Sequence, residues 1–206
     1  MIIRNIFYAI LLGAGMAACL SQNDKDEGDK STGTALEQPE TETTAQPLTP
    51  TAEQLQILPE KVGFISIGDD IEQMRQSIPA GFTIQDTTLQ QEGTEATAYI
   101  IRPEAHSKGF LVEQQCNPAC AVWRFNVQSD KYKTAKGIAV GTTYKQVQQA
   151  HPISTVTLGD AGLVAVAKDG GISFILDEDK IPANKLSRLT PETVPAATQV
   201  KAILIY

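Results

Sequence analysis

The sequence has few of the residues on which enzymes and metal sites depend. Its 206 residues include only two histidines, three cysteines and one tryptophan. It contains none of the motifs of serine hydrolases, phosphate-binding loops, zinc proteases or dinucleotide sites. With so few histidines, general acid–base catalysis would rest on carboxylates that the sequence does not single out. We therefore expect no enzymatic activity, no cofactor and no metal.

An excess of basic charge is also missing. The formal net charge is −7, and residues 20–60, with nine acidic residues and two lysines, account for all of it. Residues 61–206 hold fifteen acidic and fourteen basic residues, a net charge of −1. Because nucleic-acid binding needs a strongly basic face, we expect no nucleic-acid partner.

The amino terminus has the order of a bacterial export signal. Arg4 precedes an apolar run of roughly a dozen residues, whereas a membrane-spanning helix takes about 20. The run ends in Met16-Ala17-Ala18-Cys19, which resembles the lipobox of bacterial lipoproteins. That resemblance implies a signal peptide over residues 1–18 and palmitate-type acyl chains on Cys19 that hold the protein to membrane lipid. An ordinary signal followed by a chance cysteine is the alternative.

Residues 19–55 are predicted to be a disordered tether. They are rich in acidic residues, Thr and Pro, and poor in aromatic and branched apolar residues. A flexible coil of this length spans on the order of 30 Å. The acidic cluster after Cys19 also resembles an export signal of Bacteroidetes lipoproteins, although a plain solvated tether is the favoured interpretation. We expect a lipid-anchored protein of the cell envelope, at the periplasmic or surface face of the outer membrane.

The folded part contains an internal repeat. Shifted by 73 residues, 65–79 aligns without a gap on 138–152, and glycine, glutamine and proline coincide at several positions. In each copy a short strand is followed by a Gly turn, by Asp69 or Thr142 as the expected N-cap, and by an amphipathic helix that ends at Pro. We expect a capping box between Asp69 and Glu72, and none in the second copy.

Several strands separated by turn signals come after each helix, so adjacent strands should form antiparallel hairpins. The predicted fold class is α+β, with two tandem strand–helix–antiparallel-sheet repeats, residues 56–130 and 131–206, and short helices packed on one sheet face. Trp123 and Phe125 alternate along one predicted strand and are expected to fill the core together, while His151 is expected at its boundary.

The order of elements resembles two known groups. These are the small lipoproteins of the outer-membrane barrel-assembly machinery and the β-lactamase-inhibitor-protein fold. The resemblance is carried by the fifteen-residue motif 65–79 and its copy 138–152. It implies a non-catalytic protein-binding or assembly-accessory module with an envelope protein partner. The alternative is a lipoprotein that binds a small molecule or glycan in a groove between the repeats.

The remaining candidate site residues are a pair of cysteines and a stretch of basic residues. Cys116 and Cys120 flank Asn117-Pro118-Ala119 between two predicted strands, and in an oxidising compartment such a pair favours a disulfide over a redox or metal site. A basic stretch could bind an anionic partner, although a solvated connector is the favoured interpretation. Its members are Arg124, Lys131, Lys133, Lys136 and Lys145.

Overall fold

The computed structural model describes residues 48–91 and 93–206, which lie in one compact unit, Thr44–Tyr206. The expectations for the signal peptide, Cys19 and the tether up to residue 47 fall outside the described residues. Within them, no helix is long and apolar enough to cross a membrane. The elements are η1 Glu53–Leu55, β1 Gln56–Leu58, β2 Lys61–Val62, β3 Ile65–Ser66, α1 Ile71–Gln76, β4 Phe82–Gln91, β5 Thr94–Pro103, β6 Phe110–Cys116, β7 Cys120–Val127, β8 Lys133–Thr134, α2 Tyr144–Ala150, β9 Ile153–Gly159, β10 Gly162–Ala167, β11 Ile172–Leu176, α3 Ala183–Leu186 and β12 Val200–Ile205.

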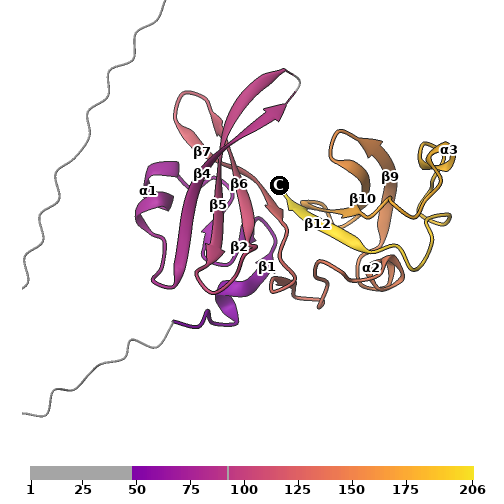
Figure 1. Ribbon diagram of the computed structural model, residues 1–206, viewed down its shortest axis with the longest axis horizontal. Coiled ribbons are helices and arrows are strands. Elements are labelled where there is room, and N and C mark those ends of the chain that lie inside the picture. Colours follow the sequence, from indigo (N-terminus) through magenta and orange to yellow (C-terminus); the bar gives the residue numbers. More distant parts are fainter. Residues whose placement is uncertain (1–47, 92) are drawn as a thin grey trace, which may run out of the picture. The chain divides into compact units, whose positions relative to one another are not determined.

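The predicted α+β class is wrong, because the described chain is mostly β. Its three α-helices have six, seven and four residues. At 3.6 residues per turn, helices this short cannot form a layer of their own. The strands are longer than expected, and β4 and β5 pair over ten residues each. The described elements form an eight-stranded antiparallel sheet and a small mixed sheet (Figure 1).

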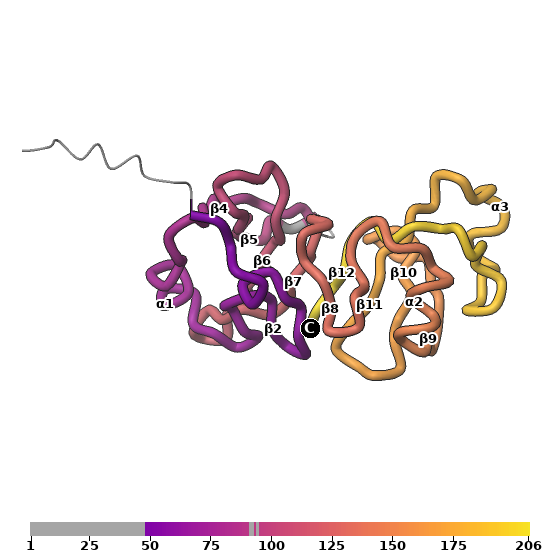
Figure 2. Tube along the Cα trace, turned by 90° about the horizontal axis from the view of Figure 1, so that it is seen from below, coloured from indigo at the N-terminus to yellow at the C-terminus, as the bar shows by residue number. Residues whose placement is uncertain are grey.

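The large sheet consists of two four-stranded meanders that meet at their last strands. The strand order is β4-β5-β6-β7-β12-β11-β10-β9. At the centre β7 pairs antiparallel with β12, with Phe125 opposite Ile205 and Val127 opposite Ile203. The carboxyl end of β12 therefore lies between the two groups of strands (Figures 1 and 2). One backbone ladder thus joins the first copy to the second.

Matching hydrogen bonds hold the strand–turn–helix motif in the two copies. The N–H of Gly68 donates to the carbonyl of Val122 at 2.8 Å, and the N–H of Gly141 donates to that of Val200 at the same distance. Both glycines have φ +87°. The turn before each helix is therefore fixed to the last strand of its own meander.

The helices begin one residue later than predicted, and the expected capping box is wrong. The N-caps are Asp70 and Thr143. Asp70 Oδ1 accepts a hydrogen bond from the N–H of Gln73 at 3.0 Å. A side chain returns to the N-cap residue in the second copy instead. There, Gln146 Oε1 accepts hydrogen bonds from the N–H and the hydroxyl of Thr143 at 3.2 and 2.8 Å.

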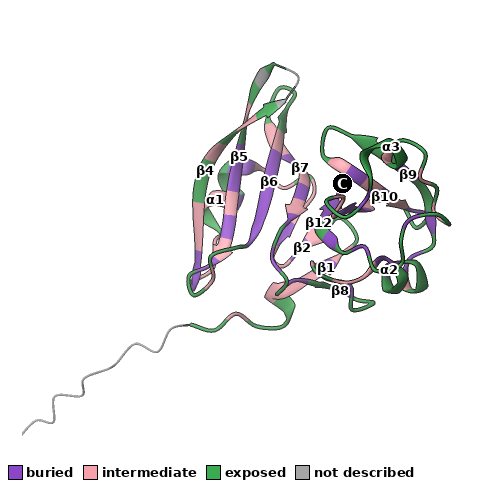
Figure 3. Cartoon of the chain, turned by 45° about the vertical axis from the view of Figure 1, so that its right-hand side comes forward, coloured by how far each residue is buried: buried purple, intermediate pink, exposed green. Residues whose placement is uncertain are grey.

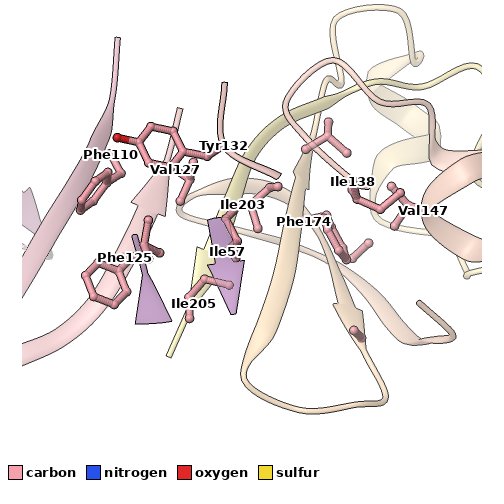
Figure 4. Packing of buried hydrophobic residues seen from close by; sticks show 14 of the residues in the cluster. Ile57, Phe110, Phe125, Val127, Tyr132, Ile138, Val147, Phe174, Ile203 and Ile205 are labelled. Carbon is pink, nitrogen blue, oxygen red and sulfur yellow. The ribbon is translucent and has the colours of Figure 1, made fainter. Parts of the chain in front are cut away.

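The main hydrophobic core runs through both copies. Figure 4 shows Ile57 beside Ile203 and Ile205, with the Phe110–Phe125–Tyr132 group on one side and Phe174 on the other. Ile57 belongs to the small sheet, whose order is β3-β2-β1-β8. In it β1 runs parallel to β8, and Ile57 pairs with Thr134. The small sheet thus connects the start of the first copy to the start of the second.

Candidate functional site

The structure confirms a disulfide between Cys116 and Cys120. The two residues are opposite each other at the end of the β6–β7 ladder, with Cα atoms 3.9 Å apart. The bond closes a five-residue turn, where β6 passes from buried at Phe110–Glu113 to exposed near the tip (Figure 3). It therefore clamps an exposed hairpin tip.

The predicted core position of Trp123 is wrong. Its side chain is 42% exposed, whereas Phe125 is fully buried. A bulge separates the two: Arg124 pairs with Glu113, Val122 pairs with Gln114, and Trp123 is the extra residue between them. An extra residue breaks the alternation of a strand, so Trp123 and Phe125 do not share a face.

A neighbouring ion pair fixes the surroundings of the indole. The Arg124 guanidinium lies over the Trp123 ring, 4.7 Å from its centroid. The same guanidinium donates to both oxygens of Glu113, from Nε at 3.0 Å and from a terminal nitrogen at 2.6 Å. The Glu113 side chain is only 7% exposed. A two-pronged charge-assisted pair of this kind holds the guanidinium in one orientation.

Two shallow hollows flank Trp123. One, of about 200 Å³, lies toward the β4–β5 hairpin and includes Leu89 and Thr97. The other, of about 230 Å³, lies toward the disulfide-closed turn and includes Asn117. Gln115 lines both hollows. We name this region the Trp123 surface, and its residues are Leu89, Thr97, Glu113, Gln115, Asn117, Trp123 and Arg124.

The predicted basic residues lie on separate elements. Arg124 is on β7, Lys133 on β8 and Lys145 on α2, while Lys131 and Lys136 flank β8. Three of the five have a carboxylate nearby: Arg124 pairs with Glu113, Lys131 Nζ is 3.6 Å from Asp130, and Lys136 Nζ is 3.0 Å from Asp169. Binding of an anionic partner by these residues stays a prediction.

His151 is buried and not at the core boundary. It comes directly after α2, is 6% exposed, and its ring lies 5.4 Å from that of Phe174. Burial, followed by the positive charge of Lys136, lowers the pKa of His151, and the nearby Asp169 carboxylate only partly opposes this. Among the described residues no cluster of three or more His, Cys, Asp or Glu is placed to hold a metal ion.

Comparison with known proteins assigns no family. No family model matches this chain, and no curated protein matches it. The crystal structure of the uncharacterized protein yfeY from Escherichia coli is similar at a TM-score of 0.48 and 11% identity, over 68% of this chain and 94% of that one. A likeness this distant carries no argument about function. The resemblance to the barrel-assembly lipoproteins and to the β-lactamase-inhibitor fold stays a prediction.

Proposed function

We propose that this protein is a non-catalytic binding module of the bacterial cell envelope, anchored through lipid on Cys19, which docks to a partner protein through the Trp123 surface. The observation that carries the proposal is the 42% exposed side chain of Trp123, the one tryptophan of the chain. Tryptophan and arginine are the residues most enriched among those that dominate the energy of protein interfaces. Here they are adjacent and in contact.

The Trp123 surface is already ordered for binding. The Arg124 guanidinium is held by both oxygens of Glu113 and rests on the indole. The disulfide closes the turn beside it. The entropy lost when side chains and loops become ordered is one of the main costs of association. A surface that is fixed in advance therefore loses less conformational entropy on docking. This arrangement favours binding to a partner without rearrangement of the surface.

The chemistry of the Trp123 surface indicates an uncharged protein segment as the partner. The charges of Arg124 and Glu113 offset each other. Leu89 supplies apolar area, while Gln115 and Asn117 supply amide groups to the hollows. An apolar centre with few free charges and a polar rim is the usual anatomy of a protein interface. Each hollow is large enough for one apolar side chain, and the amides suit the backbone of a partner loop.

The sequence at the amino terminus supports placement in the envelope. An acylated Cys19 followed by a tether of residues 19–55 would hold the domain within reach of membrane-embedded proteins. A partner exposed on the same membrane is therefore the natural occupant of the Trp123 surface.

Site-specific photocrosslinking in intact cells tests this proposal. A photoreactive residue replaces Gln115, which lines both hollows, and in a matched control it replaces Leu158, which is 46% exposed on β9. We expect one protein crosslinked from position 115, absent from position 158, and lost when Trp123→Ala is added. Equal products from both positions, or none from position 115, would contradict the proposal.

A further inference from the structure

A second site lies where the two copies meet. A pocket of about 190 Å³ is bordered by β1 of the first copy and, from the second copy, by the end of β8, His151, the β10–β11 turn and β12. The pocket does not include Trp123 or any other residue of the Trp123 surface. Binding at this junction pocket is therefore independent of the proposed docking function.

The walls of the junction pocket are apolar. Ile57 and Ile205 are almost fully buried, at 2% and 1% exposure, and Leu58 and Ile172 add further apolar surface. An apolar cavity of about 150 Å³ in another protein is large enough to hold benzene. The junction pocket therefore has room for a single six-membered ring with a small substituent.

His151 gives the junction pocket one unsatisfied polar group. The side chain lines the pocket and is 6% exposed, and neither ring nitrogen has a hydrogen-bond partner among the described residues. Nδ1 lies 3.4 Å from Asp169 Oδ2, beyond the usual length of an N–H···O hydrogen bond. Buried polar groups are nearly always hydrogen-bonded, so the imidazole lacks a partner. Both ring nitrogens are almost inaccessible to solvent, so a bound molecule supplies that partner once the imidazole turns toward the pocket.

The charges at the junction pocket cancel. Lys136 Nζ and Asp169 Oδ2 pair at 3.0 Å, and each side chain is about half exposed, at 49% and 47%. A neutral imidazole offers one donor and one acceptor. The pocket as a whole therefore suits an uncharged molecule.

We infer that the junction pocket binds a small, uncharged, ring-sized apolar molecule carrying one hydroxyl group, with the ring between Ile57, Ile172 and Ile205 and the hydroxyl hydrogen-bonded to His151. The apolar walls supply affinity, and His151 selects for the hydroxyl. A charged analogue is disfavoured because neither Lys136 nor Asp169 is free of its partner.

Methyl NMR of the full lipoprotein in lipid nanodiscs tests this inference. Isoleucine δ-methyl groups are labelled, and 4-methylphenol is titrated against toluene, which has the same ring and methyl group but no hydroxyl. Uptake by empty nanodiscs corrects the free concentration of each probe. We expect saturable shifts of the Ile57, Ile172 and Ile205 methyl signals, with 4-methylphenol binding about tenfold more tightly than toluene, the discrimination that one buried hydrogen bond gives.

Two variants keep the outcome interpretable. His151→Phe retains a ring against Phe174 and should bind both probes with equal affinity. Ala135→Phe adds a ring at an exposed position that lines the pocket and should abolish binding of both probes without disturbing the core. The inference is overturned if the wild-type methyl signals show no saturable shift, if the two probes bind equally, or if His151→Phe keeps the preference for 4-methylphenol.

Discussion

Two buried tyrosines differ in a single hydrogen bond. Tyr132 and Tyr144 are both fully buried. The Tyr144 hydroxyl donates to the carbonyl of Pro191 at 2.9 Å, whereas the Tyr132 hydroxyl has no partner among the described residues. Burial raises the pKa of both phenols, that of Tyr144 to about 12. The ring of Tyr132 packs edge-on against that of Phe110, with 5.3 Å between the ring centroids. Tyr132 therefore contributes to stability through apolar packing.

Removing each hydroxyl should therefore change stability in opposite directions. Tyr132→Phe keeps the ring packing and removes a buried group without a partner, which should raise the free energy of unfolding by about 1 kcal/mol. Tyr144→Phe leaves the Pro191 carbonyl without this donor and should lower it by about 1 kcal/mol. Urea denaturation measures both variants. Equal losses in the two would mean that the Tyr132 hydroxyl has a partner after all.

His151 should make the protein less stable in mild acid. Its pKa is lowered in the folded state from an ordinary 6.5, chiefly by burial, so the unfolded chain takes up the proton more readily. Stability is then fully present above about pH 6.5 and falls as the pH decreases toward the lowered folded value. The facing carboxylate of Asp169 stays ionised over this range, because Lys136 lowers its pKa from 3.8.

The matched variant for this pH effect is His151→Phe. Unfolding free energies at pH 7.5 and 5.5 should differ less in the variant than in the wild-type protein. If both show the same difference, the acid sensitivity belongs to other groups.

Among the elements, the sequence predicted the repeat motif but not its details. The strand, the glycine turn and the helix lie close to the positions where the 73-residue shift placed them. The N-caps differ by one residue because Asp69 and Asp70, like Thr142 and Thr143, are equally good capping residues. The choice is made by long-range hydrogen bonds such as that from Gly68 to Val122. The bulge at Trp123 depends on register with β6, which a single strand does not reveal.

The two turn glycines should respond alike to substitution. Gly68 and Gly141 both have φ +87°, and an added Cβ would meet no atom within 4 Å at either position. Alanine there should therefore lower stability only through backbone strain, by about 1 kcal/mol in each copy. Gly159 is a suitable control, since it also has open space but no left-handed φ, and Gly159→Ala should have little effect.

Thermal unfolding of the three alanine variants provides the measurement. A large loss in one copy and none in the other would argue that the two turns are not equivalent.

For the whole molecule, the local pattern predicted strands but misjudged how they combine. The amphipathic pattern predicts a layer of helices, but α1 and α2 bury only two side chains each. The pairing of β7 with β12 joins residues about 80 apart, and no short-range pattern encodes it. The junction pocket depends on such distant pairings, and the Trp123 surface depends on the bulge in the register of β6 and β7, so neither could be placed from the sequence. The disulfide was predictable because its two cysteines flank one tight turn.

The continuous sheet predicts that the two copies unfold together. Phe125 and Val127 pair with Ile205 and Ile203, and all four belong to one core. Trp123 fluorescence reports on the first copy, and hydrogen exchange of the β10–β11 amides reports on the second. We expect both to follow a single urea transition with one midpoint. Separate midpoints would show that the copies are independent units.

The central claim is that Trp123 anchors a partner protein, and the most direct test is to measure how much partner co-purifies with the lipoprotein after mild crosslinking of intact cells. The matched variants are Trp123→Ala and Leu158→Ala, which truncate side chains of similar exposure, 42% and 46%. The loss of a dominant interface residue weakens binding by about 2 kcal/mol or more, roughly thirtyfold. We predict that Trp123→Ala reduces the partner-to-lipoprotein ratio at least tenfold and that Leu158→Ala leaves it unchanged. The same ratio in both variants and in the wild-type protein would contradict the account.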